Sequence, residues 1–256
     1  MIPAAHITHW SNRVPWPTRD QVEQDLILSR LIIGISSHIE LASELVFRGG
    51  TCLHKLHLPA PLRYSEDLDY VRVSRTPIGP VFDALRDVGA EMGFSSRTEI
   101  TVHPKIRYSA VFDSGIAMRI KVEINTHETS PARPLIRIPH VVESPWWAGR
   151  GDVLTFTPTE LLATKLRALH QRRKGRDLFD LWLGLTHLGL DPLEIVACLA
   201  PYRPSGYTSK AALATFNGHM TNTAFRRDME PLVAADLGYD IEEAAQIVAT
   251  ELLELV

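Results

Sequence analysis

The spacing of apolar residues changes along the chain, from mixed helical and strand patterns to a purely helical one. A helical period from Thr18 to about Leu45 predicts a buried helix, and Thr18 with Gln21 forms a capping box at its start. Shorter runs of both kinds follow it. They predict strands at 46–47, 68–73, 97–102, 106–112 and 116–125, and helices at 51–58 and 77–92.

The pattern changes again beyond residue 126. Residues 129–158 are rich in Pro, Arg and Trp and show little periodicity. Helical patterns then cover 159–172, 176–188, 192–200, 208–216, 221–235 and 240–255. Strands first and helices later indicate an α+β unit followed by a helical unit. We place the boundary within 127–157 and assign 1–140 to an α+β domain and 141–256 to a helical C-terminal bundle.

Composition narrows the class of protein. With 256 residues, 45% of them hydrophobic and 22% charged, the chain is typical of a globular protein that buries its own core. No apolar run approaches the roughly 20 residues of a membrane span, and no signal peptide is apparent at the start. Cys52 and Cys198 lie far apart in the sequence, which argues against a disulfide framework or a zinc cluster. A reducing compartment, the cytoplasm, is therefore expected.

The net charge of −3 conceals an asymmetry. Residues 228–256 contain acidic side chains and no Lys or Arg, so the rest of the chain is basic. This distribution fits a polyanionic partner, although a solvated acidic final helix explains the tail equally simply. The densest basic run consists of Lys165, Arg167, Arg172, Arg173, Lys174 and Arg176.

The strongest chemical signal is a glycine pair between a predicted strand and a predicted helix. Gly49 and Gly50 allow close backbone approach, and the helix that follows directs its free N–H groups at the gap. Thr51 adds a hydroxyl. The three residues predict an anion site, whereas a glycine pair alone is more often only a turn.

Two carboxylates follow the glycine pair. Asp67 and Asp69 are two apart in a predicted strand, so they project from one face and need a cation between them. Oxygen ligands of this kind suit Mg²⁺, which also takes phosphate oxygens from a substrate. Phosphate cradle and carboxylate pair together indicate a site for a nucleoside triphosphate. The alternative is a solvated acidic loop.

A third carboxylate comes from a neighbouring predicted strand. Glu123 lies on the polar side of the run 120–125, opposite Ile120, Val122 and Ile124. It is either the third metal ligand or an ordinary strand carboxylate paired with Lys121, and both interpretations stay open.

These residues resemble the signature of a known family. The segments FRGGTCLHKL at 47–56 and RYSEDLDY at 63–70 look like the first motif of the AbiEii/AbiGii toxins, minimal nucleotidyltransferases of the DNA polymerase beta-like superfamily. PTELLATKLRAL at 158–169, Arg173 and RDLFDLW at 176–182 resemble the second. The two motifs span about Phe47 to Trp182 and occur in the family's order. The implied fold is a polymerase-beta-like α+β sheet followed by a helical C-terminal bundle.

The resemblance also implies roles for individual residues. Gly49, Gly50 and Thr51 would hold the triphosphate, and Asp67, Asp69 and Glu123 would hold Mg²⁺. Lys165 would contact the nucleotide phosphates or the leaving pyrophosphate; otherwise it is a surface lysine. Ser65 lies at a position where a serine of such toxins can be phosphorylated, which silences the enzyme; otherwise it is a capping or turn residue. The remaining nucleotide-site residues are Arg176, Asp177 and Asp180, which can equally form a structural salt bridge.

The implied activity is transfer of a nucleoside monophosphate from an NTP to an RNA 3′ end. A tRNA acceptor end is the expected target, and a cognate antitoxin on a separate chain is the expected partner. The basic run that contains Arg167, Arg172, Arg173 and Lys174 would bind RNA, unless it is only a solvated helix face. Trp146 and Trp147 would either stack on bases or pack. The alternatives are a small-molecule, antibiotic-type nucleotidyltransferase and a non-catalytic binding scaffold.

Overall fold

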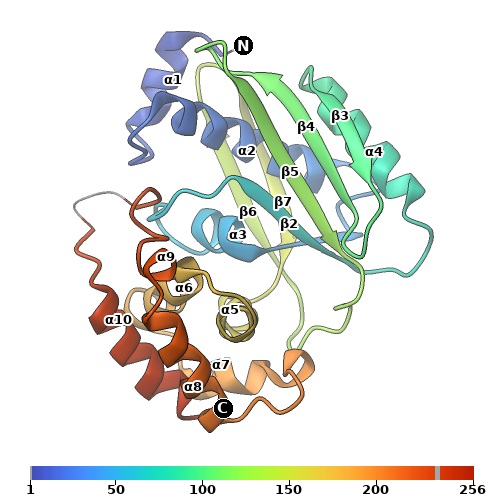
Figure 1. The fold of residues 1–256 in the computed structure, drawn as a ribbon. Coiled ribbons are helices and arrows are strands. Elements are labelled where there is room, and N and C mark those ends of the chain that lie inside the picture. Colours follow the sequence, from blue (N-terminus) through green and yellow to red (C-terminus); the bar gives the residue numbers. More distant parts are fainter. Residues whose placement is uncertain (1, 234–236) are drawn as a thin grey trace. The chain divides into compact units, whose positions relative to one another are not determined.

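The computed structural model describes residues 2–233 and 237–256 and divides the chain into two compact units (Figure 1). Unit 1 comprises residues 1–129 and 135–156, and unit 2 comprises residues 130–134 and 157–256. The expected division between residues 140 and 141 falls inside a strand of unit 1. The reason is a hairpin in the segment that showed little periodicity, which extends the sheet of unit 1 up to residue 155.

Unit 1 combines a mixed sheet with four helices in its described residues. The helices are α1 (Ala4–Ser11), α2 (Arg19–Ser37), α3 (Gly49–Leu56) and α4 (Gly79–Glu91). The strands are β1 (Leu45–Arg48), β2 (Asp67–Arg72), β3 (Ser95–Glu99), β4 (Lys105–Val111), β5 (Ala117–Asn125), β6 (Ile136–Glu143) and β7 (Ala148–Thr155). Their order in the sheet is β3-β4-β5-β2-β1-β7-β6. Strand β2 runs antiparallel to β1 and parallel to β5.

One face of the β2, β4 and β5 strands is apolar and buried. Ile106, Ile120, Val122 and Ile124 are almost fully inaccessible, as the strand period predicted. Tyr108 lies on this face and donates its hydroxyl proton to the carbonyl of Leu85 in α4, 2.6 Å away. Helix α4 therefore covers this face, and α2 packs beside α4, as Figure 1 also shows. The opposite face carries the polar residues of the same strands.

Several predicted boundaries in unit 1 needed correction. The helix predicted from Thr18 to about Leu45 ends at Ser37. Residues 40–44 form turns, and Leu41 is nevertheless buried. Because Leu41 stands at a helical spacing from the apolar residues of α2, the pattern predicted a longer helix. The capping box at Thr18 is confirmed. Helix α3 begins at Gly49, so the glycines form its first turn instead of preceding it. The hairpin turn at 113–115 is confirmed, with φ of 83° at Gly115.

Unit 2 is helical in its described residues. Its α-helices are α5 (Pro158–Gln171), α6 (Gly175–Thr186), α7 (Pro192–Cys198), α8 (Ser209–Met220), α9 (Thr223–Arg226) and α10 (Ile241–Val248). A 3₁₀ turn spans Ala200–Tyr202, and a π-helical turn spans Ala249–Leu253. The helix predicted at 221–235 is therefore much shorter, and its last two residues lie outside the described part. Among residues 2–233 and 237–256, no helix is long and apolar enough to cross a membrane.

Candidate functional site

The glycine pair lies where β1 passes into α3. Gly49 has a φ of 82°, and a Cβ atom there would lie 2.5 Å from Asp69 Oδ2. A Cβ atom on Gly50 would collide with the guanidinium of Arg63. Both glycines belong to the first helical turn, where N–H groups have no partner within the helix. Their lack of side chains therefore lets the start of α3 approach a carboxylate and a guanidinium at once.

Thr51 connects α3 to the segment that leads into β2. Its buried hydroxyl donates to the carbonyl of Asp67 at 2.5 Å and lies 2.7 Å from Ser65 Oγ. This contact holds Ser65 beside the first turn of α3. Four of the residues predicted for the nucleotide site, Gly49, Gly50, Thr51 and Ser65, are consequently neighbours in unit 1.

The three predicted metal ligands lie on one face of adjacent strands. In the parallel pairing of β2 with β5, Asp69 is opposite Glu123 and Asp67 is opposite Lys121. Residues two apart share a face, so all four side chains project from the polar side of the sheet. Asp67, Asp69 and Glu123 are neither fully exposed nor fully buried. The solvated acidic loop, the alternative for the aspartates, is not what the structure shows, because both lie in a strand.

A lysine ammonium lies among these carboxylates. Lys121 Nζ is 3.1 Å from Asp67 Oδ2 and 3.3 Å from Glu123 Oε2. Glu123 is thus paired with Lys121, as one of its two interpretations expected. The pairing does not remove the other interpretation, because a half-exposed lysine can exchange for a metal ion. Lys121 supplies the cation that two nearby carboxylates require.

The surroundings of Asp69 disfavour its ionised form. Burial, together with the nearby Asp67 carboxylate, raises the pKa of Asp69, although Arg48 and Lys121 oppose the increase. Arg48 is opposite Asp69 in the β1–β2 pairing and forms an ion pair with Glu128. A carboxylate in this condition gains from an added cation.

The residues present fit a hard divalent cation as donors, but they do not form a closed cage. Three carboxylates on neighbouring strands are oxygen ligands of the type that Mg²⁺ accepts. Within residues 2–233 and 237–256, however, no three Asp, Glu, His or Cys side chains converge closely enough to hold a metal. Binding would require Lys121 to leave its position between Asp67 and Glu123. Substrate phosphate oxygens would complete the ligand shell.

The second group of predicted residues lies in unit 2, where α5 faces α6. Lys165 is buried, and its ammonium is 2.8 Å from Asp180 Oδ2 and 3.2 Å from Asp177 Oδ1. Both aspartates are completely buried. Lys165 is therefore no surface lysine, and the two motifs at 158–169 and 176–182 meet in one ion cluster.

Arg172 completes this cluster from the end of α5. Its Nε and Nη2 atoms donate to the two oxygens of Asp177, at 2.7 and 2.8 Å. Burial alone would raise the pKa of Asp177, but Lys165 and Arg172 together lower it. Asp177 and Asp180 are thus held in salt bridges, as the structural alternative expected, but with Lys165 and Arg172 among their partners and not through a pair along α6 with Arg176. Their role in a nucleotide site stays a prediction. Arg176 is half-buried, and its backbone N–H donates to Asp228 Oδ2 at 3.1 Å.

The basic run predicted to bind RNA is only partly available. Arg172 is committed to Asp177, and the Arg167 guanidinium lies 5.7 Å from the centre of the Tyr202 ring. Arg173 and Lys174 are exposed in the turn before α6. Arg172 is exposed as well, but its guanidinium is bound to Asp177, so Arg173 and Lys174 remain as the candidate RNA contacts of the run.

The aromatic pair of the β6–β7 hairpin packs within unit 1. Trp146 and Trp147 lie 4.9 and 5.3 Å from the guanidinium carbon of Arg30 in α2. Trp147 also covers Gly149, where a side chain would collide with its ring. Of the two interpretations of this pair, packing is the one that the structure supports.

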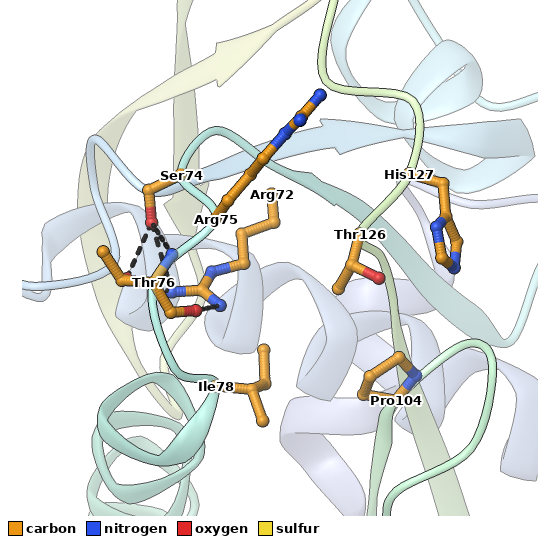
Figure 2. A pocket seen from close by; sticks show the side chains of 8 residues that line it. All are labelled: Arg72, Ser74, Arg75, Thr76, Ile78, Pro104, Thr126 and His127. Atoms are coloured by element: carbon orange, nitrogen blue, oxygen red, sulfur yellow. Dashed lines mark hydrogen bonds between the residues drawn. The ribbon is translucent and has the colours of Figure 1, made fainter.

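A pocket of about 550 Å³ lies at the other end of β2 (Figure 2). Arg72, whose side chain is buried, directs its hydrogen bonds into its own loop, to Ser74 and Thr76, and also pairs with Glu44. Figure 2 shows Thr126 and His127 on the facing chain segment. Arg72 therefore stabilises the loop after β2, and the pocket contains none of the predicted site residues.

Three residues beside the site were not assigned a role from the sequence. Arg48 and Arg63 flank the glycine pair, and Lys121 was considered only as a partner of Glu123. The arginines stand inside the motif segments at 47–56 and 63–70, so their position beside the glycines was the available signal. The positive charges of Arg48 and Arg63 lie beside the start of α3 and offset the negative charge of the carboxylates there.

Replacement of Gly49 by alanine tests the importance of the close approach between the Gly49 backbone and the Asp69 carboxylate. We expect Gly49→Ala to lower the transfer rate at least tenfold, because the new methyl group displaces the Asp69 carboxylate and misplaced groups lose rate steeply. The matched control is Gly115→Ala, which has a φ of 83° and open space around its Cβ position. Both variants carry the same backbone strain of about 1–2 kcal/mol. Equal transfer rates in the two variants would show that the approach to Asp69 is unimportant.

One family model matches most of the chain. The family model described as nucleotidyl transferase AbiEii toxin, type IV toxin–antitoxin system, matches residues 30–248. No curated protein matches the sequence. Among solved structures, the chain is similar to MenT4, a nucleotidyltransferase toxin from Mycobacterium tuberculosis H37Rv, at 17% identity and a TM-score of 0.49, covering 96% of this chain and 97% of that one. It is also similar to an antigenic nucleotidyltransferase-like protein from Paracoccidioides brasiliensis, at 17% identity and a TM-score of 0.39, covering 85% and 92%.

The family match covers both groups of predicted site residues. It covers the glycine pair and carboxylates of unit 1 and the lysine–aspartate cluster of unit 2. The matched range is most of the chain. The protein therefore belongs to the AbiEii family of nucleotidyl transferase toxins from type IV toxin–antitoxin systems, which implies a cognate antitoxin.

Proposed function

We propose that this nucleotidyltransferase toxin transfers a nucleoside monophosphate from an NTP to the 3′ end of an RNA, with a tRNA acceptor end as the target. The observation that carries the proposal is the Gly49–Asp69 approach, which places a helix start beside strand carboxylates in register with Glu123. Helix N–H groups bind phosphate, and carboxylates hold the cation that phosphate brings. Modification of an acceptor end would block aminoacylation and thus translation.

We propose a role for each of these residues. The first turn of α3 and Thr51 bind the triphosphate, and Asp67, Asp69 and Glu123 would hold Mg²⁺. When bound, magnesium supplies the positive charge that phosphoryl transfer requires. Lys121 keeps the carboxylates from repelling one another in the absence of substrate. In unit 2, Lys165 orders Asp177 and Asp180 and supplies positive charge for the phosphates.

The test is incubation with each labelled NTP, Mg²⁺ and total RNA. Label in a tRNA-sized band is the expected result. Label on a small molecule would instead support an antibiotic-type nucleotidyltransferase, and no label on any acceptor would support a binding scaffold. RNA binding by Arg173 and Lys174 is part of the proposal, because both are exposed.

Ser65 is proposed as a site of inhibitory phosphorylation. Its hydroxyl lies 2.7 Å from Thr51 Oγ1, so a phosphate there would place about −1.5 to −2 charges beside the triphosphate site. We expect Ser65→Glu to weaken NTP binding at least tenfold in calorimetric titrations, because like charges repel. The neutral control Ser65→Gln has similar size. Equal weakening by both variants would indicate crowding and would contradict the electrostatic explanation.

A further inference from the structure

The polar face of the sheet continues beyond the carboxylates as an ordered set of basic side chains. Strand pairing places Asp67 opposite Lys121, Lys121 opposite Arg107, and Arg107 opposite Arg97. These four residues form one row across β2, β5, β4 and β3. With strands about 4.8 Å apart, the row extends roughly 14 Å from Asp67 to the edge of the sheet.

A second basic position lies next to this row. Arg119 is two residues before Lys121 in β5, so it shares the same face, and it is exposed. Arg97 is exposed as well, whereas the Arg107 side chain, 43% exposed, contacts Glu99 at 3.0 Å. On this face, strands β3–β5 carry five basic and two acidic residues: Arg97, Lys105, Arg107, Arg119 and Lys121, with Glu99 and Glu123.

Protection of a sheet edge against pairing with other chains explains only part of this pattern. Charged residues are common on edge strands, and β3 is an edge strand. Arg119, however, is on β5, an inner strand of the sheet, where it pairs with Ser109 of β4, and its side chain points away from the buried face. Strand β2 pairs with β5 from Lys121 onward, so Arg119 lies just beyond the carboxylate end of β2. The net charge of this face is 0 on β3, +2 on β4 and +1 on β5, so the positive charge lies mainly on the strands between the edge and the carboxylates. A role for this face beside the carboxylates accounts for both the position of Arg119 and the distribution of the positive charge.

We propose that the polar face of β3–β5, with Arg97, Arg107 and Arg119 as its accessible cations, is a docking surface for the phosphodiester backbone of the RNA acceptor. The proposal rests on the proposed function and extends it. An RNA end that reaches Asp67 and Asp69 must approach negative charge with its own negative charge. A basic row ending at those carboxylates offsets that repulsion and guides the strand toward them.

Charge reversal of the two exposed arginines tests the surface. We compare Arg97→Glu/Arg119→Glu with Arg13→Glu/Arg150→Glu, which changes the net charge equally at partly exposed arginines elsewhere in unit 1. The probe is a labelled RNA hairpin with a single-stranded 3′ overhang, titrated between about 50 and 200 mM salt by fluorescence anisotropy. NTP affinity and thermal unfolding are measured on the same samples.

The docking surface predicts a specific loss. Arg97→Glu/Arg119→Glu should weaken RNA binding at least tenfold at low salt, and the slope of log affinity against log salt should fall by about 1.4–1.8, the contribution of two phosphate contacts. NTP affinity should stay within twofold, and the control variant should bind RNA within twofold of wild type. RNA affinity no lower than that of the control overturns the proposal.

The failure of this surface is distinguishable from failure of the proposed function. Wild-type protein that labels RNA while the two variants bind RNA equally would overturn the surface alone. Wild-type protein that binds RNA through Arg97 and Arg119 but transfers no nucleotide would support the surface and overturn the proposed function. Wild-type protein that does not bind RNA would overturn both.

Discussion

Asp69→Asn is expected to lower nucleotidyl transfer by about a thousandfold and to leave the fold intact. The amide keeps the size of the carboxylate, so the close contact with the Gly49 backbone is preserved. It removes a negative charge that a metal ion requires, and lost charge stabilisation in a transition state costs about 10²–10³ in rate. The rate is measured in single-turnover experiments at saturating NTP and Mg²⁺.

The stability of this variant is expected to equal or exceed that of wild type. The raised pKa of Asp69 means that its ionised form is disfavoured in the folded protein, chiefly by burial and secondarily by Asp67. A neutral amide relieves that cost. Asp87→Asn, which removes an exposed carboxylate from α4, is the control and should match wild type in both measurements. A normal transfer rate in Asp69→Asn would eliminate the carboxylate site as the centre of the reaction.

The second large effect is expected at Lys165. Lys165→Ala leaves Asp177 and Asp180 buried with one counter-charge fewer, and breaking a buried ion cluster in this way costs about 3–5 kcal/mol of unfolding free energy. It also removes a charge proposed to stabilise the leaving pyrophosphate, so the transfer rate of the remaining folded protein should fall about a hundredfold. Both quantities are needed because unfolding alone lowers the observed activity.

Two comparisons separate these contributions. Lys210→Ala removes an exposed lysine from α8 and should change neither stability nor rate. Lys165→Met/Asp177→Asn/Asp180→Asn removes both buried carboxylates together with the buried ammonium, and the Arg172 guanidinium that it leaves behind is 52% exposed and can be solvated by water. This triple variant should therefore regain stability but not rate. If this triple variant regains rate as well, Lys165 is a structural residue and does not act on the phosphates.

Acid titration gives an independent check on the cluster. The lowered pKa of Asp177 contributes stability above the unfolded value of about 3.9, and this contribution is lost as the pH falls through the lower folded value. In Lys165→Ala, burial opposes ionisation with less compensation. The variant should therefore lose less stability than wild type on acidification.

The glycine and carboxylate chemistry could be predicted from the sequence because it depends on short-range order. Asp67 and Asp69 are two apart in a strand, and a period of two fixes their common face whatever the rest of the fold. Glu123 required more, namely that β5 pairs beside β2 in register. The apolar alternation of 120–124 predicted its face, but it could not show which strand pairs with β5.

The hairpin β6–β7 could not be predicted in the same way. Pro139 interrupts the pattern of β6, and a proline in a strand argues against a strand unless that strand lies at an edge. Strand β6 is such an edge strand, so its proline is tolerated, but only the completed sheet shows this. Gly149 and Gly151 in β7 obscure the pattern further, because they leave room for Trp147 and for Ser36 of α2.

The ion cluster of unit 2 escaped the sequence for a related reason. The spacing of Arg176, Asp177 and Asp180 predicted a salt bridge along one helix. The partner of both aspartates is instead on α5, twelve residues or more earlier in the chain, and contact between helices is a tertiary property. Burial of Lys165 follows from that contact and is not encoded by its immediate neighbours.

The interleaving of the two units has a consequence for how this chain can be cut and joined. Residues 130–134 belong to unit 2, and the backbone N–H groups of Ala132 and Arg133 donate to the buried Glu160 carboxylate at 2.6 and 3.0 Å. A fragment starting at residue 157 would leave that carboxylate without these amide donors. Truncations and chimaeras with related toxins should therefore keep residues 130–134 together with the helices of unit 2, and limited proteolysis should be interpreted with the same division. On the ribosome, residues 130–134 emerge before the helices of unit 2 that they complete. Unit 2 can therefore finish folding only when these residues, which are synthesised between two segments of unit 1, bind to it.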